Sequence, residues 1–340
     1  MDHHTRLSNA LAGLPVDRPP VWFMRQAGRY MAEYRAIREK VSFLELCADA
    51  ELACEVTCQP VDRFGVDAAI VFSDILTIPE AMGQEVVFDQ GHGPRLPSPL
   101  RSLDDVRALR QPDVADALPV VPATLRSFRA ARPHVPILGF AGAPFTLLCY
   151  MVEGGGSRNW LHVKRMLFSD PATATELLDR LADVVGDYLQ AQIQAGAAGV
   201  QMFDTWAGML SVEDYQRFAL PAAQRAMARV SGAPRIYFTR DTSPFLHLVT
   251  QTGADAIGLD WRVDMARARA ELGAVPVQGN LDPVALYAPA EEIKARVHRI
   301  CDAAGPLGHV FNLGHGVLPT TPLTGVEAMI EAVKERSSPR

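Results

Sequence analysis

Two arginines near the start of the chain are of a type and spacing that could bind an anionic ligand. Arg25 and Arg29 flank the short stretch Gln26-Ala27-Gly28. A guanidinium group keeps its positive charge at physiological pH and can hold a carboxylate through two parallel hydrogen bonds. The pair therefore predicts a ligand with several negative charges. The same arginines could instead form salt bridges with acidic residues of the protein.

Four other polar side chains have chemistry of their own. Asp74 could be catalytic, orient a ligand or pair with an arginine such as Arg29, because an unpaired buried carboxylate is costly. His315 lies between two glycines and could be an acid, a base, a metal ligand, a hydrogen-bond donor or a structural residue. Tyr150 and Thr205 offer only hydroxyl groups, each of which alone is more often structural.

Eight short apolar segments alternate with amphipathic helical patterns along the chain, and these patterns include helices predicted over 44–64 and 212–230. Because the segments lack polar alternation, they are typical of strands covered on both faces of a parallel sheet. Strict alternation with helices predicts an α/β fold, a (β/α)8 TIM barrel, with a doubly wound open sheet as the alternative. The segments are 20–24, 68–73, 137–141, 199–203, 235–239, 256–260, 275–278 and 310–313.

The 340 residues predict a single domain, 1–340, with an N-terminal helix and extended loops at 83–122 and 150–169. No change in composition marks a linker. In a TIM barrel the active site lies on the loops that follow the strands. Polar and glycine residues follow the predicted strands directly. The segments that precede the strands are plain, short connections. This asymmetry indicates an enzyme.

Composition excludes several classes of function. The formal net charge of −6 argues against a nucleic-acid partner, which usually meets a basic surface. No apolar stretch approaches the roughly 18 residues of a membrane span, and no signal peptide is recognisable, which predicts a cytoplasmic protein with no membrane partner. The five cysteines form no zinc-binding pattern, so no metal is expected, and buried thiols of the core are the predicted role. None of the four lysines follows a predicted strand, which argues against Schiff-base chemistry.

Long motifs in the sequence resemble the uroporphyrinogen decarboxylase family. The segment PVWFMRQAGRY at 20–30 is similar to the N-terminal signature of that family, and GFAGAPFTL at 139–147 is similar to its second signature. Shorter similarities follow in the family's order across nearly the whole chain. They are FSDIL at 72–76, YMVEGG at 150–155, GNLDP at 279–283 and NLGHG at 312–316.

The resemblance implies a barrel enzyme of heme biosynthesis. Such an enzyme converts the four acetate side chains of uroporphyrinogen III to methyl groups, giving coproporphyrinogen III and four CO2. The resemblance also implies no metal, no organic cofactor, a cytoplasmic location and a homodimer. By motif position, the substrate-binding residues are Arg25, Gln26, Ala27, Gly28, Arg29, Asp74, Tyr150, Thr205 and His315. The expected catalytic set is Asp74, Arg29, Arg25, Tyr150 and His315. Thr205 stands where many relatives have Ser.

The implied chemistry explains why no cofactor is needed. A pyrrole ring that is protonated at a carbon becomes an electron sink for the departing carboxylate, as pyridoxal phosphate would be. Asp74 can accept hydrogen bonds from the pyrrole N–H groups and stabilise the cation. Arg25 and Arg29 would bind carboxylates, with Arg29 positioning the acetate. The proton donor stays unassigned: arginine is a reluctant acid, and His315 has the better intrinsic pKa.

Two other functions are compatible with such a barrel. Corrinoid-dependent methyltransferases of the same fold bind zinc through a His-x-Cys pair and a later Cys, and no His in this sequence is followed two residues later by Cys. A tetrapyrrole carrier without catalytic activity would have little use for Arg25, Arg29, Asp74 and Tyr150 together. Metal analysis and anaerobic incubation with uroporphyrinogen distinguish these functions from a decarboxylase.

Overall fold

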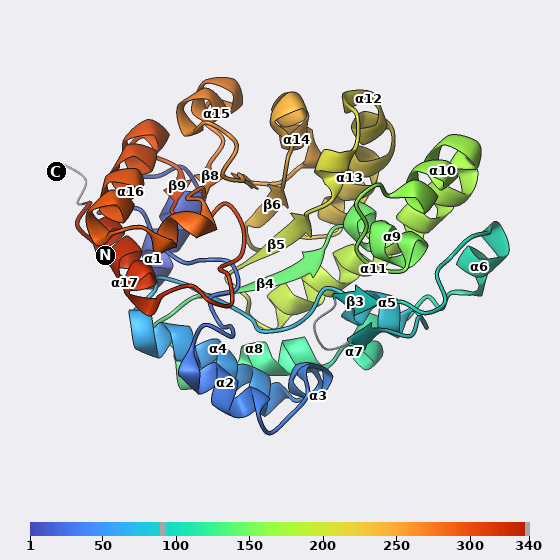
Figure 1. Cartoon of the computed structure of the whole chain (residues 1–340), viewed down its shortest axis with the longest axis horizontal. Coiled ribbons are helices and arrows are strands. Elements are labelled where there is room, and N and C mark those ends of the chain that lie inside the picture. The colour runs from blue at the N-terminus through green and yellow to red at the C-terminus, as the bar shows by residue number, and fades with distance from the viewer. Residues whose placement is uncertain (89–92, 337–340) are drawn as a thin grey trace.

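A curled parallel β-sheet forms the centre of the computed structural model, which describes residues 1–88 and 93–336 (Figure 1). Within these residues, seven strands pair in the order β1-β4-β5-β6-β7-β8-β9. The strands are β1 (Ala69–Ile70), β4 (Ile137–Gly142), β5 (Gly199–Asp204), β6 (Arg235–Thr239), β7 (Ala256–Gly258), β8 (Val277–Gln278) and β9 (His309–Val310). Each lies in or overlaps one of the predicted segments, and neighbours in sequence are neighbours in the sheet.

The segment 20–24 closes this sheet into a barrel. Val21 forms a parallel bridge with Phe311, just after β9. On its other side, the Val21 carbonyl accepts a hydrogen bond from the Asp67 amide at 2.7 Å, just before β1. Pro19 and Pro20 have no amide hydrogen to donate, which limits the segment to isolated bridges. The predicted TIM barrel is therefore confirmed, and the open doubly wound sheet was the wrong alternative.

Helices surround the barrel, as Figure 1 shows. The α-helices are α1 (His3–Leu11), α2 (Ala32–Arg38), α3 (Phe43–Ala48), α4 (Ala50–Phe64), α5 (Thr77–Ala81), α6 (Leu103–Ala108), α7 (Val114–Ala117), α8 (Val120–Ala131), α9 (Pro144–Glu153), α10 (Leu161–Ser169), α11 (Pro171–Gln194), α12 (Val212–Asp214), α13 (Leu220–Ala228), α14 (Leu246–Val249), α15 (Met265–Leu272), α16 (Ala290–Ala304) and α17 (Leu323–Lys334). Short 3-10 turns are η1 (Ala207–Met209), η3 (Ser243–Phe245), η4 (Thr250–Thr252) and η5 (Pro283–Tyr287), and η2 (Tyr215–Ala219) is a π-helix. Among the described residues, no helix has both the length and the apolar character that crossing a membrane requires.

Three local features differ from the sequence prediction. The helix expected over 44–64 is divided at Asp49, whose side chain accepts hydrogen bonds from the amides of Glu51 and Leu52 and so begins α4. The helix expected over 212–230 contains the π-helix η2, next to Pro221, which cannot donate a helical hydrogen bond. The loop expected over 83–122 contains an antiparallel hairpin, β2 (Val87–Phe88) with β3 (Pro94–Arg95).

The N-terminal helix α1 packs against the barrel at the end where the strands begin. Its apolar side chains Leu7 and Leu11 belong to a buried cluster with Trp22, Phe238 and Val310. The side chains of this cluster fill the barrel on the side where the strands begin. All five cysteines are free and buried, in agreement with their expected role as core thiols.

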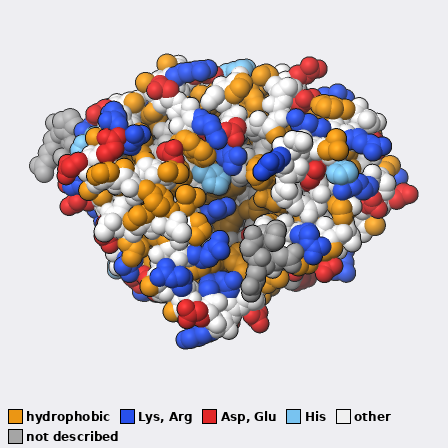
Figure 2. Space-filling model, viewed as in Figure 1, with side chains coloured by type: hydrophobic (Ala, Val, Ile, Leu, Met, Phe, Trp, Pro, Cys, Tyr) orange, Lys and Arg blue, Asp and Glu red, His pale blue; other side chains and the backbone are white. Residues whose placement is uncertain are grey.

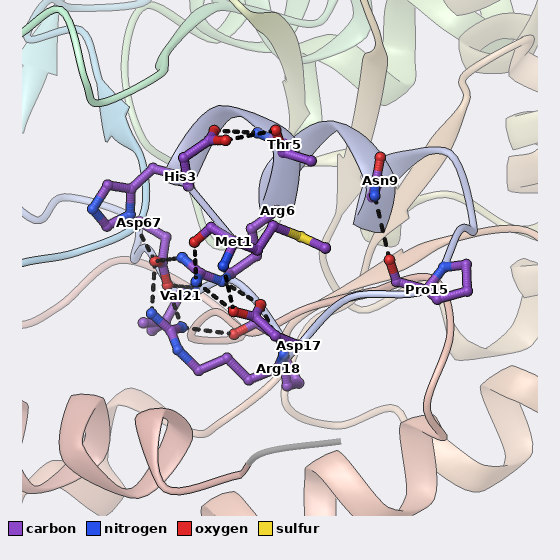
Figure 3. A network of polar contacts seen from close by, with 12 residues as sticks. Met1, His3, Thr5, Arg6, Asn9, Pro15, Asp17, Arg18, Val21 and Asp67 are labelled. Carbon is purple, nitrogen blue, oxygen red and sulfur yellow. Dashed lines mark hydrogen bonds and ion pairs between the residues drawn. The ribbon is translucent and has the colours of Figure 1, made fainter. Parts of the chain in front are cut away.

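A buried ionic network joins α1 to the closure of the barrel (Figure 3). The fully buried Asp67 carboxylate accepts hydrogen bonds from Arg6 Nη1 at 2.9 Å, Arg18 Nη1 at 2.6 Å and the Val21 amide at 2.8 Å. Burial alone would raise the pKa of Asp67, but hydrogen bonds from His3 and Arg18 and the charge of Arg18 hold the pKa well below its usual range. The network is therefore a structural element that fixes the segment 20–24.

We expect Asp67→Asn to lower the free energy of unfolding by about 3–5 kcal/mol, because it leaves buried guanidinium groups without their counter-charge. Urea unfolding followed by circular dichroism measures this change. Asp62→Asn is the matched control, since Asp62 pairs with Arg132 at 2.6 Å on the surface and should contribute about 1 kcal/mol or less. Equal losses in the two variants would contradict a special role for the buried network.

Candidate active site

A cavity of about 430 Å³ opens at the end of the barrel where the strands finish. Its volume lies within the usual range for ligand sites, about 300–1,000 Å³. Figure 2 shows a hollow near the centre of this face, with hydrophobic side chains inside it and basic side chains around it. Seven of the nine predicted site residues line the cavity: Arg25, Gln26, Ala27, Asp74, Tyr150, Thr205 and His315.

Gly28 and Arg29 are not among the described residues that line the cavity. Both belong to the turn after segment 20–24, and Arg25 and Arg29 are both exposed to solvent, but only Arg25 lines the cavity. The Arg29 carbonyl accepts a hydrogen bond from Arg35 Nη1 at 2.8 Å, which ties this turn to α2. The structure shows no salt bridge between Arg29 and Asp74. The two arginines that the spacing grouped together therefore have different surroundings.

Aromatic rings from neighbouring strands line the cavity from within the barrel. Phe140 on β4 meets Phe203 on β5 edge to face, with ring centroids 5.7 Å apart. Phe203 in turn lies 5.7 Å from Phe238 on β6. Such a surface suits the apolar body of a ring-shaped ligand, because it excludes water and offers no polar group to satisfy. These residues are not in the predicted set, because buried strands carry no alternation that shows which side chains point inward.

Arg25 holds an unusual backbone conformation at the cavity rim. Its φ is +60°, in the left-handed region, where a non-glycine residue is strained and usually held by its surroundings. A Cβ at Gly316 would lie 2.4 Å from Arg25 Cδ, so the glycine next to His315 gives the arginine side chain its space. Gln26 is fully buried and supports the turn, since its side chain contacts the Phe23 amide and the Ala68 carbonyl.

Asp74 is a half-buried carboxylate that lies just after β1. Its Oδ1 accepts a hydrogen bond from the Leu76 amide at 2.8 Å. Burial raises the pKa of Asp74 to about 6 from 3.8, and the Leu76 hydrogen bond and the positive charge of Arg25 oppose only part of that rise. A negative charge is thus held in a mostly apolar cavity, where it would be stabilised by a hydrogen-bond donor or a cation.

Tyr150 and Thr205 approach the cavity from two adjacent strands. Tyr150 is on α9, after β4, and its ring lies 6.1 Å from the ring of Trp206, edge to face. Burial raises the pKa of the Tyr150 phenol, so this hydroxyl stays protonated. Thr205 directly follows Asp204 at the end of β5. Both hydroxyl groups can therefore donate a hydrogen bond to a ligand.

A buried network holds the end of β5 in place. Asp204 accepts hydrogen bonds from Thr146 Oγ1 at 2.7 Å and from the Tyr237 hydroxyl at 2.6 Å. Thr146 Oγ1 also accepts a hydrogen bond from the Trp206 amide at 3.2 Å. Burial raises the pKa of Asp204 to about 6 although these hydrogen bonds oppose it. The network fixes the backbone on both sides of Thr205.

His315 lies among aromatic rings and positive charges. Its ring is 6.2 Å from Phe238 and 6.3 Å from Trp261. Burial and the charges of Arg25 and Arg240 lower the pKa of His315 to about 3. The imidazole is therefore neutral near pH 7, and a neutral imidazole can both donate and accept a hydrogen bond. The better intrinsic pKa that favoured it as an acid in the sequence is lost in this environment.

Arg240 and Trp206 are two further cavity residues outside the predicted set. Arg240 follows β6 and Trp206 follows β5, so the rule that active sites lie after strands could have found them. Within residues 1–88 and 93–336, no three His, Cys, Asp or Glu side chains gather in an arrangement that could hold a metal ion.

Comparison with solved structures shows what fold the chain shares. It resembles a methyltransferase from Methanosarcina mazei with a TM-score of 0.84, at 20% identity over 98% of this chain and 99% of that one. A B12-independent methionine synthase from Shewanella matches with a TM-score of 0.58, at 12% identity over 87% of this chain and 88% of that one. At these identities the likeness establishes the barrel fold alone.

Comparison with sequences is more specific. The family model described as uroporphyrinogen decarboxylase (URO-D) matches residues 2–336. A uroporphyrinogen decarboxylase of Geobacter metallireducens is 48% identical over 98% of this chain and 99% of its own length. That of Myxococcus xanthus is 49% identical over 96% of this chain and 95% of its own length. The family match and this identity extend over nearly the whole chain, and the chain therefore belongs to the uroporphyrinogen decarboxylase family.

Proposed function

We propose that this chain converts the four acetate side chains of uroporphyrinogen III to methyl groups, giving coproporphyrinogen III and four CO2. The observation that carries the proposal is Asp74, a carboxylate in an aromatic cavity that also holds Arg25. This combination suits a flat ring system that becomes cationic during the reaction and carries carboxylates at its edge. Membership of the decarboxylase family supports the same reaction.

The chemistry requires no group besides the substrate and a proton at each step. A proton added to a pyrrole carbon beside the acetate makes the ring cationic. The bond between the acetate CH2 and its carboxylate then breaks, CO2 leaves, and the electron pair enters the ring. A proton added to the exocyclic carbon completes the methyl group, and loss of the ring proton restores the pyrrole. Each acetate thus consumes one proton and releases one CO2.

In this proposal Asp74 accepts hydrogen bonds from the pyrrole N–H groups. Its charge, held in the apolar cavity, stabilises the cationic ring more strongly than it would in water. Arg25 holds a carboxylate at the rim, and neutral His315 with the Tyr150 and Thr205 hydroxyls orients others. Arg29 positions an acetate from the outer part of the same turn. No residue is assigned as the proton donor.

The proposal extends to the organisation of the protein as a single domain, 1–340, that acts in the cytoplasm as a homodimer. The family match over residues 2–336 supports one domain. Leu161 and Phe168 on α10 support an interface, since they are seven residues apart on one helical face and 65% and 61% exposed. No metal or organic cofactor is part of the proposed reaction.

A corrinoid-dependent methyltransferase activity is a weaker alternative. The methyltransferase from Methanosarcina mazei shares the fold, but only at 20% identity. The positive charges that lower the pKa of His315 also oppose binding of a metal cation by its ring. The sequence resemblance and the relatives both favour the decarboxylase.

Anaerobic incubation of the purified protein with uroporphyrinogen III tests the proposed function. We expect products with seven, six, five and finally four carboxylates, separated by chromatography after oxidation to porphyrins. Asp74→Asn should lower the rate at least a hundredfold because it removes the charge that stabilises the cationic ring. Binding of uroporphyrinogen by the wild-type protein without any product would instead indicate a carrier, and stoichiometric zinc with no product would indicate the methyltransferase.

Asp74→Asn should also change stability with pH. Because burial raises the folded-state pKa to about 6 from 3.8, ionisation destabilises the folded protein. That penalty is absent below about pH 4, grows as pH rises through the interval and is complete above about pH 6. We therefore expect Asp74→Asn to melt higher than wild type at pH 7, and the difference to vanish at pH 4. The exposed Asp116 provides the control variant, Asp116→Asn, which should show no such trend.

Arg29→Lys tests whether Arg29 positions the acetate through two hydrogen bonds. Lysine keeps the charge but cannot form the planar paired contact, so kcat/KM should fall about tenfold. Arg63→Lys, at a surface arginine paired with Glu33, is the control and should retain the wild-type value. Near-normal turnover by Arg29→Lys would show that Arg29 does not hold the acetate in this way.

A further inference from the structure

A third arginine, Arg240, lines the cavity and lies outside every motif that carried the family resemblance. It directly follows β6, and its guanidinium carbon lies 5.4 Å from the centre of the Trp206 ring. The side chain is 27% exposed, which places its charged end at the boundary between cavity and solvent. An arginine supported on an aromatic face in this way keeps a defined orientation.

Arg240 and Arg25 occupy opposite sides of the cavity. Segment 20–24 lies between β9 and β1, and the sheet then continues through β4 and β5 to β6. Counted around a barrel of eight strand positions, β6 is four positions from segment 20–24. Because Arg25 follows that segment and Arg240 follows β6, a molecule that spans the cavity would lie between the two guanidinium groups.

The guanidinium of Arg240 is only partly used by the protein. Its Nε donates a hydrogen bond to Asp241 Oδ2 at 3.0 Å. In the described part of the chain, its two terminal nitrogens have no protein acceptor. Asp241 also pairs with Arg262, whose guanidinium carbon lies 4.3 Å from the centre of the Trp261 ring. The Asp241 carboxylate is thus shared between two arginines, which leaves the terminal nitrogens of Arg240 available to a ligand.

The backbone that carries Arg240 is closely held. Asp241 has a φ of +61°, and its amide donates a hydrogen bond to the buried Asp260. A Cβ at Gly208 would lie 2.2 Å from the Arg240 carbonyl oxygen, so η1 packs directly against this turn. A rigid turn reduces the entropy that a bound ligand would otherwise lose by ordering the side chain.

We propose that Arg240 is a further substrate-binding residue, which holds a carboxylate of uroporphyrinogen opposite Arg25. The inference rests on the proposed function, because it takes its ligand from that reaction. Trp206 supports one face of the guanidinium, Asp241 holds Nε, and the terminal nitrogens meet the substrate carboxylate. Two fixed arginines across the cavity then set how the macrocycle is seated over Asp74.

The test compares Arg240→Gln and Arg240→Lys with wild type in steady-state assays on uroporphyrinogen III under anaerobic conditions. Loss of a charged hydrogen-bonding group should raise KM about tenfold or more, with a smaller effect on kcat. Lysine keeps the charge but not the fork, so Arg240→Lys should give an intermediate KM. Raising the salt concentration should weaken wild-type kcat/KM more than that of Arg240→Gln, because one ion pair with the substrate is gone.

Arg262→Gln is the matched control. It removes the same charge and the same partner, Asp241, but Arg262 is not among the described cavity residues, so KM should stay within about twofold of wild type. Equal effects of the two glutamine variants, or a wild-type KM in Arg240→Gln with an unchanged melting temperature, would overturn the inference. Loss of kcat with a lowered melting temperature and no recovery in Arg240→Lys would show a structural role and also overturn it. Wild-type turnover in the same assay separates this outcome from failure of the proposed function.

Discussion

Asp67 connects segment 20–24, the first strand position of the barrel, to the start of β1. It does so through both its backbone and its side chain. Its amide donates to the Val21 carbonyl at 2.7 Å, and its carboxylate accepts from the Val21 amide at 2.8 Å. The Asp67 carboxylate thus accepts the hydrogen bond that a backbone carbonyl of a neighbouring strand would usually accept. Segment 20–24 begins with proline and makes few other hydrogen bonds to its neighbours in the sheet. Arg6 and Arg18 hold that carboxylate from α1 and the following loop. The turn that places Arg25 over the cavity begins only three residues beyond Val21, so the site depends on a network at the opposite end of the barrel.

The cavity combines charged groups with a mostly apolar lining. Burial in this lining explains the shifted pKa values of its titratable groups. Burial disfavours the ionised form of each titratable group, so it raises the pKa of Asp74 and lowers that of His315. Arginine resists this effect because its intrinsic pKa is far above neutrality. The charges of Arg25 and Arg240 are among the causes that lower the pKa of His315. The overall charge of −6 belongs to the rest of the protein surface and does not describe this cavity.

The sequence predicted the order of the barrel because eight apolar segments alternate with helices, and it predicted most of the site because polar residues follow those segments. It could not separate Arg25 from Arg29. Their spacing is compatible with one shared site, but the turn brings only Arg25 into the cavity. Nor could it find Phe140 and Phe203, since strands buried on both faces give no periodic sign of which side chains point inward. The helix predicted over 44–64 is interrupted at Asp49. The Asp49 side chain accepts hydrogen bonds from the next amides, which ends one helix and begins the next.

The proposed function separates binding of the substrate's charge from control of the reacting ring. In that proposal, arginines bind carboxylates at the rim, where the charge of the guanidinium group does not change near neutral pH. Asp74 lines the same cavity as Phe140, Phe203 and Phe238, and in the proposal this apolar lining strengthens its effect on a cationic ring. A pKa near 6 leaves Asp74 ionised at neutral pH while its burial leaves the charge poorly solvated. The folded protein therefore carries an unfavourable charge before the substrate binds, and a ring that becomes cationic provides the compensation that the apolar cavity lacks.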